Sequence, residues 1–142
     1  MTDKWELGQT GEELAADYLR KQGYRILHHN WNLHRGCELD LVAEKQGELH
    51  FIEVKTRRRV SAIYGSPEEA INARKMQHIQ SAISYYIKLN HIDSDTPLHM
   101  DAIAIVYREE NDFDLKFIPD IHFFSFSRAQ YSGRQKGWRY YS

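Results

Sequence analysis

The sequence contains one cysteine and three prolines in 142 residues, and it has no long apolar run. A single cysteine, Cys37, excludes an intramolecular disulfide and any zinc site built from several cysteines. No segment approaches the roughly 20 consecutive apolar residues that a membrane-spanning helix needs. The first residues lack the basic start and apolar stretch of a secretory signal. We therefore expect a cytoplasmic protein with no membrane partner.

An excess of charge of either sign is also lacking, because the formal net charge is −1. This balance does not by itself indicate a nucleic-acid-binding protein, but the charges are segregated along the chain. Basic residues dominate 55–59 and the last fifteen residues, whereas acidic residues concentrate at 109–114. A phosphate-binding face on a nearly neutral protein is therefore compatible with the sequence.

The length fits one domain over residues 1–142, with a core over about 8–118. Residues 130–142 interleave basic and aromatic side chains. Such a tail suits single-stranded nucleic acid, where bases stack on rings and arginines hold the backbone. Docking of the same tail on the protein's own core is an equal alternative, and we expect the tail to be loosely ordered.

Hydrophobic periodicity predicts two helices and five strands. The helices are expected over about 8–22 and 66–89, and the second begins with the capping pair Ser66 and Pro67. The strands are expected over 24–29, 38–43, 49–56, 98–107 and 113–118. Residues 30–36 are expected to form a polar loop, and Gln46-Gly47 the turn of an antiparallel hairpin. The order α-β-β-β-α-β-β predicts an α/β fold with a mixed sheet and a helix on each side.

Two pairs of charged residues lie inside apolar strand segments of the predicted hairpin. Glu38 and Asp40 are two residues apart on one strand, and Glu53 and Lys55 are two apart on the next. Alternation along a strand predicts that the members of each pair share a face. Charges in strand centres cost free energy unless they pair or bind a metal. The pattern therefore predicts either a buried ion-pair network without catalytic role or a site for Mg²⁺ or Mn²⁺.

Metal-assisted phosphodiester hydrolysis is the chemistry that fits the second alternative. Asp40 and Glu53 would bind the metal, with Glu38 in support, and the metal would lower the pKa of a bound water. Lys55 would hold the attacking water or stabilise the charged transition state. Glu12 would supply a further acid if the first helix packs over the hairpin.

Several short motifs together resemble the YraN family. They are Gly8-x-x-Gly11-Glu12, Gly36-x-Glu38-Leu39-Asp40-Leu41-Val42, Phe51-Ile52-Glu53-Val54-Lys55-Thr56-Arg57, Gly65-x-Pro67, Lys75 and His99-Met100-Asp101. The resemblance covers about residues 8–107. That family is similar to the PD-(D/E)XK nucleases, and within them to archaeal Holliday-junction resolvases.

The resemblance implies a restriction-endonuclease-like fold of three layers, α/β/α, around a central mixed sheet. It also implies that Asp40 and Glu53 bind the divalent metal, that Lys55 assists the nucleophile and that Glu12 completes the site. The sequence departs from the pattern in two places. No proline precedes Asp40, and Cys37 separates Gly36 from Glu38, which blurs the register of Glu38 and ranks it below Asp40.

Basic residues follow the predicted catalytic lysine directly. Arg57, Arg58 and Arg59 have the fork geometry that binds phosphates beside a scissile bond, although a solvated loop is the alternative. Arg74 and Lys75 on the second helix are weaker candidates for the same contact. Asp101 begins an apolar strand, and we expect a structural role in which it pairs with an arginine or caps backbone amides. The eight histidines show no metal-ligand spacing.

The sequence therefore predicts a divalent-metal-dependent endonuclease or nuclease-like protein that hydrolyses phosphodiester bonds in DNA, with branched or damaged DNA as candidate substrates. The first alternative is a non-catalytic nucleic-acid-binding module with the same fold. A second is an interaction domain in which the charged cluster is structural. A homodimer is compatible with the prediction, because cutting a junction twice requires two sites.

Overall fold

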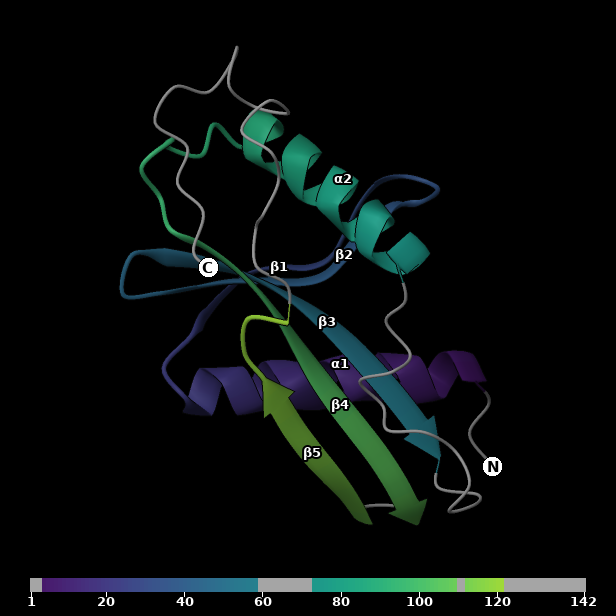
Figure 1. The fold of residues 1–142 in the computed structure, drawn as a ribbon. Coiled ribbons are helices and arrows are strands. Elements are labelled where there is room, and N and C mark those ends of the chain that lie inside the picture. Colours follow the sequence, from purple (N-terminus) through teal and green to yellow (C-terminus); the bar gives the residue numbers. More distant parts are fainter. Residues whose placement is uncertain (1–3, 59–72, 110–111, 122–142) are drawn as a thin grey trace.

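The structure is a computed structural model that describes residues 4–58, 73–109 and 112–121 (Figure 1). Its elements are α1 (Lys4–Lys21), β1 (Arg25–His34), β2 (Cys37–Lys45), β3 (Glu48–Arg58), α2 (Ala73–Leu89), β4 (Leu98–Glu109) and β5 (Asp112–Ile118). The predicted order α-β-β-β-α-β-β is confirmed. The predicted helix start at Ser66-Pro67 and the predicted tail over 130–142 lie outside the described residues. No described helix is long and apolar enough to cross a membrane.

The five strands form one mixed sheet in the order β1-β2-β3-β4-β5. Only β3 and β4 pair in parallel, and the other neighbours are antiparallel. The β2–β3 hairpin closes at Lys45↔Glu48. Gln46 and Gly47 between them have φ angles of 53° and 80°. Two positive φ angles in a two-residue loop match the twist of the flanking strands, which explains why the predicted hairpin forms here.

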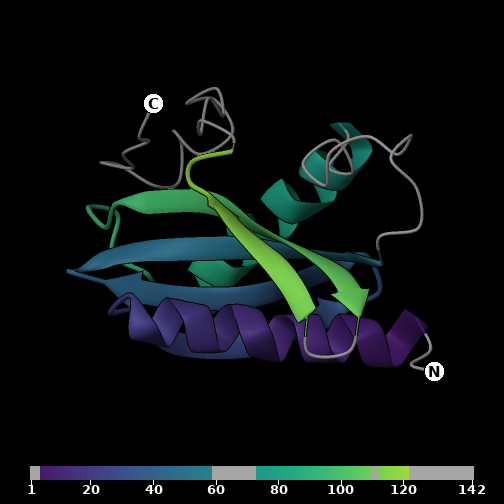
Figure 2. The same cartoon turned by 90° about the horizontal axis from the view of Figure 1, so that it is seen from below.

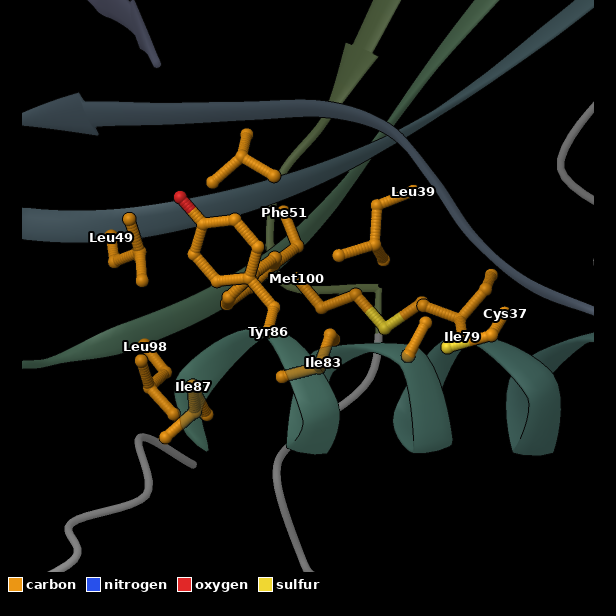
Figure 3. Packing of buried hydrophobic residues seen from close by; sticks show 12 residues of the cluster. Cys37, Leu39, Leu49, Phe51, Ile79, Ile83, Tyr86, Ile87, Leu98 and Met100 are labelled. Atoms are coloured by element: carbon orange, nitrogen blue, oxygen red, sulfur yellow. The ribbon is translucent and has the colours of Figure 1, made fainter. Parts of the chain in front are cut away.

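The two helices cover opposite faces of the sheet, and each closes its own apolar cluster. Ile79, Ile83 and Tyr86 of α2 point at strand residues such as Phe51 (Figure 3). Ala15, Ala16 and Leu19 of α1 pack on the other face, against Leu41, Ile52 and Ile103. Figure 2 shows α1 lying along this second face. Because alternate residues of β3 enter different clusters, the predicted α/β arrangement of a mixed sheet between two helices is confirmed.

The expected loop over residues 30–36 is wrong, because β1 continues to His34. It pairs with β2 through Trp31↔Leu39 and His34↔Cys37. The Trp31 ring meets that of Tyr86 edge-on at 5.3 Å, a long-range contact that the polar local sequence does not reveal. The exposed polar side chains of β1 face solvent on this edge strand, so they do not oppose pairing. The first helix also begins earlier than predicted, at Lys4.

Candidate active site

The ends of β2 and β3 bring Asp40 and Glu53 together. Backbone pairing between these strands stops at Leu41↔Ile52, and continuing the register by one residue places Asp40 opposite Glu53. Asp40 Oδ2 instead accepts a hydrogen bond from the Val54 amide at 2.8 Å. A side-chain hydrogen bond also links Glu53 to Asp40. The Asp40 carboxylate thus replaces the missing backbone contact, which fixes its position beside Glu53.

Strand β2 changes its alternation at Asp40. Leu39 belongs to the cluster under α2, whereas Leu41, two residues on, belongs to the cluster under α1. The expectation that Glu38 is embedded among apolar residues is wrong, because Glu38 is exposed. Its Oε1 accepts a hydrogen bond from Asn32 Nδ2 at 3.3 Å. The break in alternation turns Leu39 and Leu41 to opposite faces of the sheet, and local sequence spacing does not reveal such a break.

Glu53 is the most deeply buried acid of the site, at 6% exposed. Its Oε1 lies 3.1 Å from Nζ of Lys75, which projects from the first turn of α2. Burial raises the pKa of Glu53 well above its usual range, repulsion from Asp40 adds to the rise, and Lys75 opposes it. Lys75 was predicted only as a phosphate contact, so its pairing with Glu53 is a feature that sequence reasoning missed.

The ammonium of Lys75 stands in the field of three acids. Burial alone acts to lower the pKa of Lys75, but Glu53, Asp40 and Glu38 together raise it. The lysine therefore stays charged and supplies the positive charge of the site. Lys55, the predicted catalytic lysine, is half-buried two residues beyond Glu53 on β3, and no ion pair joins it to a carboxylate of the described residues.

Glu12 reaches the site because α1 packs closely on β3. A Cβ atom at Gly11 would lie 2.1 Å from Oγ1 of Thr56, so only glycine permits this approach. Within the described part of the chain, Glu12 Oε1 is buried and has no hydrogen-bond partner. Burial and the nearby Asp40 charge raise the pKa of Glu12 to about 7. The first helix thus packs over the hairpin, which is the condition that the sequence set for a role of Glu12.

Basic side chains continue from the carboxylates along the same elements. Arg57 is half-buried and Arg58 exposed at the end of β3, and Arg74 is exposed beside Lys75 on α2. Arg59, predicted to contact phosphate with them, lies outside the described residues. The described arginines are therefore carried by the two elements that also carry Glu53 and Lys75.

The donor set suits a hard divalent cation. Mg²⁺ prefers oxygen ligands, keeps several waters and needs as few as one or two protein carboxylates. Asp40 and Glu53 supply two, and the unpartnered oxygen of Glu12 lies in the field of Asp40. Across residues 4–58, 73–109 and 112–121, no group of three or more histidine, cysteine or acidic side chains has a metal-binding arrangement. The fit to Mg²⁺ therefore rests on the two carboxylates of Asp40 and Glu53 alone.

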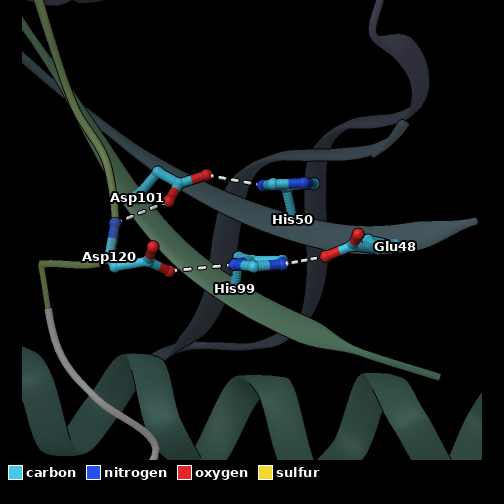
Figure 4. Close-up of polar contacts among 5 residues, drawn as sticks. All are labelled: Glu48, His50, His99, Asp101 and Asp120. Carbon is cyan, nitrogen blue, oxygen red and sulfur yellow. Dashed lines mark hydrogen bonds and ion pairs between the residues drawn. The ribbon is translucent and has the colours of Figure 1, made fainter. Parts of the chain in front are cut away.

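A second polar cluster lies at the opposite end of β3 and β4, where these strands begin (Figure 4). His50 Nδ1 lies 2.7 Å from Asp101 Oδ2, and Asp101 Oδ1 accepts a hydrogen bond from the Asp120 amide at 2.8 Å. His99 bridges Asp120 at 2.9 Å and Glu48 at 2.5 Å. The two imidazole rings stack at 4.4 Å. We call these five residues the histidine clasp.

The clasp has a structural explanation. It joins the starts of β3 and β4 to Asp120, which follows β5. The expected structural role of Asp101 is confirmed in that it caps a backbone amide, but its side-chain partner is a histidine and not an arginine. Sequence reasoning missed the clasp because its key contact depends on the parallel register His50↔His99.

A family profile described as "Uncharacterised protein family UPF0102" matches residues 11–105. The chain belongs to the UPF0102 family. The family membership predicted from the YraN-like motifs is thereby confirmed. The matched region of this UPF0102 member contains Glu12, Asp40, Glu53, Lys55 and Lys75, so all the central residues of the candidate site lie within the part shared with the family.

Curated relatives carry the same family name. A UPF0102 protein of Syntrophomonas wolfei is 54% identical over 83 residues, which cover 58% of this chain and 70% of its own. One of Flavobacterium psychrophilum is 35% identical over 120 residues, covering 84% and 96%. One of Trichlorobacter lovleyi is 41% identical over 115 residues, covering 80% and 87%. The similarity thus extends over most of the UPF0102 chain.

Proposed function

We propose that this protein is a divalent-metal-dependent endonuclease that hydrolyses phosphodiester bonds in DNA, with a PD-(D/E)XK-type site on a restriction-endonuclease-like fold. The contact between Asp40 and Glu53 carries the proposal, together with Lys55, which lies two residues beyond Glu53 on β3. Two carboxylates held together in a half-buried place repel each other unless a cation compensates them. Mg²⁺ or Mn²⁺ is the cation that their oxygen atoms favour.

Each residue of the site has a role in this proposal. Asp40 and Glu53 would hold the metal, which would lower the pKa of a bound water and offset charge on the scissile phosphate. Lys55 attracts the attacking water or stabilises the negative charge of the transition state, and its ammonium is not already paired with a described carboxylate. Glu12, whose Oε1 is buried without a hydrogen-bond partner in the described part of the chain, would accept a hydrogen bond or a proton at the site.

The basic side chains suit the phosphate backbone of DNA. Arg57 and Arg58 extend from the strand that carries Glu53 and Lys55, and Arg74 stands on α2. Arginine forks bind phosphate with two hydrogen bonds and fix the register of the duplex without reading its sequence. Branched or damaged DNA is the candidate substrate, and a homodimer would cut both strands of a junction.

A non-catalytic nucleic-acid-binding module is the second candidate, and one observation favours it. Glu53 already has a counter-ion in Lys75, and no group of three or more potential ligands has a metal-binding arrangement in the described part of the chain. A protein that has lost turnover would keep the fold and the arginines while an internal ion pair compensates the buried acid.

Cleavage of labelled linear, nicked, flapped and four-way-junction DNA in Mg²⁺ or Mn²⁺ tests the first proposal. We expect Asp40→Ala and Lys55→Ala each to lower the cleavage rate by about 10²-fold or more, the scale of losing one charge-stabilising group. Lys88→Ala is the matched control, because Lys88 is exposed at the far end of α2. Circular dichroism establishes that every variant is folded.

The same assay separates the two candidates. Cleavage that disappears in EDTA and in both site variants supports the endonuclease. Absence of cleavage on every substrate, together with DNA binding that is equally tight in EDTA, would establish the binding module instead.

A further inference from the structure

The ion pair between Lys75 and Glu53 joins a partly exposed side chain to a buried one. The Lys75 side chain is 43% exposed and stands in the first turn of α2, whereas that of Glu53 is 6% exposed within β3. A lysine has a flexible four-carbon stem and a compact charge that water solvates well. Lys75 can therefore withdraw into solvent, while Glu53 has no comparable route.

Lys75 also stands where a bound cation would act. Its Nζ lies 3.1 Å from Oε1 of Glu53, one of the two carboxylates that we propose to hold the metal. The acids that bear on it are Glu53, Asp40 and Glu38, the three predicted to serve the metal. A divalent cation among these carboxylates would repel the ammonium at short range. The two positive charges therefore compete for the Glu53 carboxylate.

From this geometry we infer that Lys75 is a built-in counter-ion, which pairs with Glu53 while the divalent cation is absent and leaves Glu53 when the cation binds. The inference rests on the proposed metal-dependent function. It makes Lys75 a positioning residue that acts through Glu53. The site then has two states, in which the carboxylates are compensated either by the single charge of Lys75 or by the double charge of the cation.

The exchange has a consequence for substrate binding. Binding coupling is reciprocal, so the metal weakens the Lys75–Glu53 contact as much as that contact weakens metal binding. The released ammonium lies next to Arg74 in the chain, on the first turn of α2. The ammonium is then available to attract a DNA phosphate. Metal binding would thus prepare the phosphate-binding face as well as the reacting centre.

The test measures the reactivity of Lys75 in the wild-type protein. The protein is treated with acetic anhydride in EDTA or in saturating Mg²⁺, and acetylation of each lysine is followed by peptide mass spectrometry. Release from a half-buried ion pair is expected to raise the Lys75 acetylation rate by about fivefold. Lys88, which is exposed in the last turn of the same helix, is the internal control and should not change.

A matched variant identifies Glu53 as the partner that holds the lysine. In Glu53→Gln, Lys75 should react at the fast rate in EDTA already, and Mg²⁺ should not increase it further. If Glu53→Gln fails to fold, the wild-type acetylation rates in EDTA and in Mg²⁺ still test the counter-ion role, because they need no substitution.

Calorimetric titration with Mg²⁺ separates the inference from the proposed function. Metal binding with Lys75 acetylation unchanged would overturn the counter-ion role and leave the endonuclease proposal standing. No detectable Mg²⁺ or Mn²⁺ binding would overturn both. We expect that Mg²⁺ binds and that, of Lys75 and Lys88, only Lys75 is acetylated faster in Mg²⁺ than in EDTA.

Discussion

At the scale of the residue, Gly11 shows how one missing side chain positions the site. A Cβ atom at residue 11 would lie 2.1 Å from Oγ1 and 3.2 Å from Cβ of Thr56. With a side chain there, α1 could not lie as close to β3 as it does. The next residue, Glu12, approaches Asp40 because of this close packing. The glycine is therefore required by tertiary contact, although glycine in a helix interior is unfavourable for the helix itself.

We predict that Gly11→Ala lowers the free energy of unfolding by about 1–3 kcal/mol, the usual cost of overpacking a well-filled contact. Urea denaturation provides the measurement. The double variant Gly11→Ala/Thr56→Ala removes the clashing oxygen and should recover part of the loss. Additive losses in the double variant would show that the contact with Thr56 is not the cause.

The Glu12 carboxyl makes stability depend on pH. Its pKa is about 7 in the folded protein against a usual value of 4.5, so the folded state holds the proton more tightly. Stability from this group is therefore lost as pH rises from about 4.5 to about 7. We predict that Glu12→Gln makes the protein more stable than wild type at pH 8 by about 1 kcal/mol, a value discounted from the full shift because Glu12 is only half-buried.

Urea unfolding of both proteins at pH 5 and pH 8 checks this prediction. The gain from Glu12→Gln should be concentrated at pH 8, where wild-type Glu12 is ionised. An equal effect at both pH values would mean that the charge of Glu12 is not the cause.

At the scale of the element, the histidine clasp holds three parts of the sheet together. Glu48 and His50 start β3, His99 and Asp101 start β4, and Asp120 follows β5. Tyr24 packs edge-on against His50, with Lys45 above the tyrosine ring. The clasp therefore links the far end of the sheet to the segment before β1, away from the candidate active site.

We predict that His99→Gln destabilises the protein by about 1–2 kcal/mol near pH 6, the scale of one or two charge-assisted hydrogen bonds. Burial acts to lower the pKa of His99, but the hydrogen bonds to Asp120 and Glu48 outweigh it and the pKa is raised. The stabilisation is fully present below pH 6.5 and is lost as pH rises through the folded-state pKa.

Thermal unfolding of His99→Gln beside wild type at pH 6 and pH 9 is the corresponding measurement. The difference between the two proteins should shrink at pH 9. His29→Gln, at an exposed position on β1, is the control and should have little effect at either pH. A loss that is the same at both pH values would exclude the protonated imidazole as its source.

At the scale of the whole molecule, apolar packing on both faces of the sheet leads us to expect a fold that does not depend on a metal. Apolar clusters close both faces of the sheet, and the carboxylates lie beyond the point where β2–β3 pairing ends. We predict that EDTA leaves the protein folded and removes only the extra stability that Mg²⁺ adds. That gain is about 2.7 kcal/mol when Mg²⁺ is present at 100 times its dissociation constant.

Thermal melts in EDTA and in Mg²⁺ measure this gain. Asp40→Asn should melt identically in both, because it removes one of the two carboxylates that we propose to hold the metal. Unfolding of the wild-type protein by EDTA, or an equal Mg²⁺ effect in Asp40→Asn, would contradict the prediction.

The sequence by itself determined the order of elements and the adjacency of Asp40 and Glu53. Apolar periodicity is a local property, and the Gln46-Gly47 turn sets the hairpin register over a few residues. Once that register is known, the two carboxylates must lie near each other. Spacing alone left a metal site and a structural ion-pair network as alternatives, and the resemblance to the YraN family favoured the catalytic hypothesis. The packing of a helix on each face followed from the order of elements.

Only the tertiary structure decided which charges meet and which strands extend. Lys75 reaches Glu53 across the connection between β3 and α2, and His50 stacks on His99 through a parallel register. The second half of β1 is stabilised by the contact between the Trp31 and Tyr86 rings. Glu12 reaches the site because Gly11 lies against Thr56. These contacts join residues far apart in the chain, where neither spacing nor local propensity carries information, so packing of the whole domain determines them.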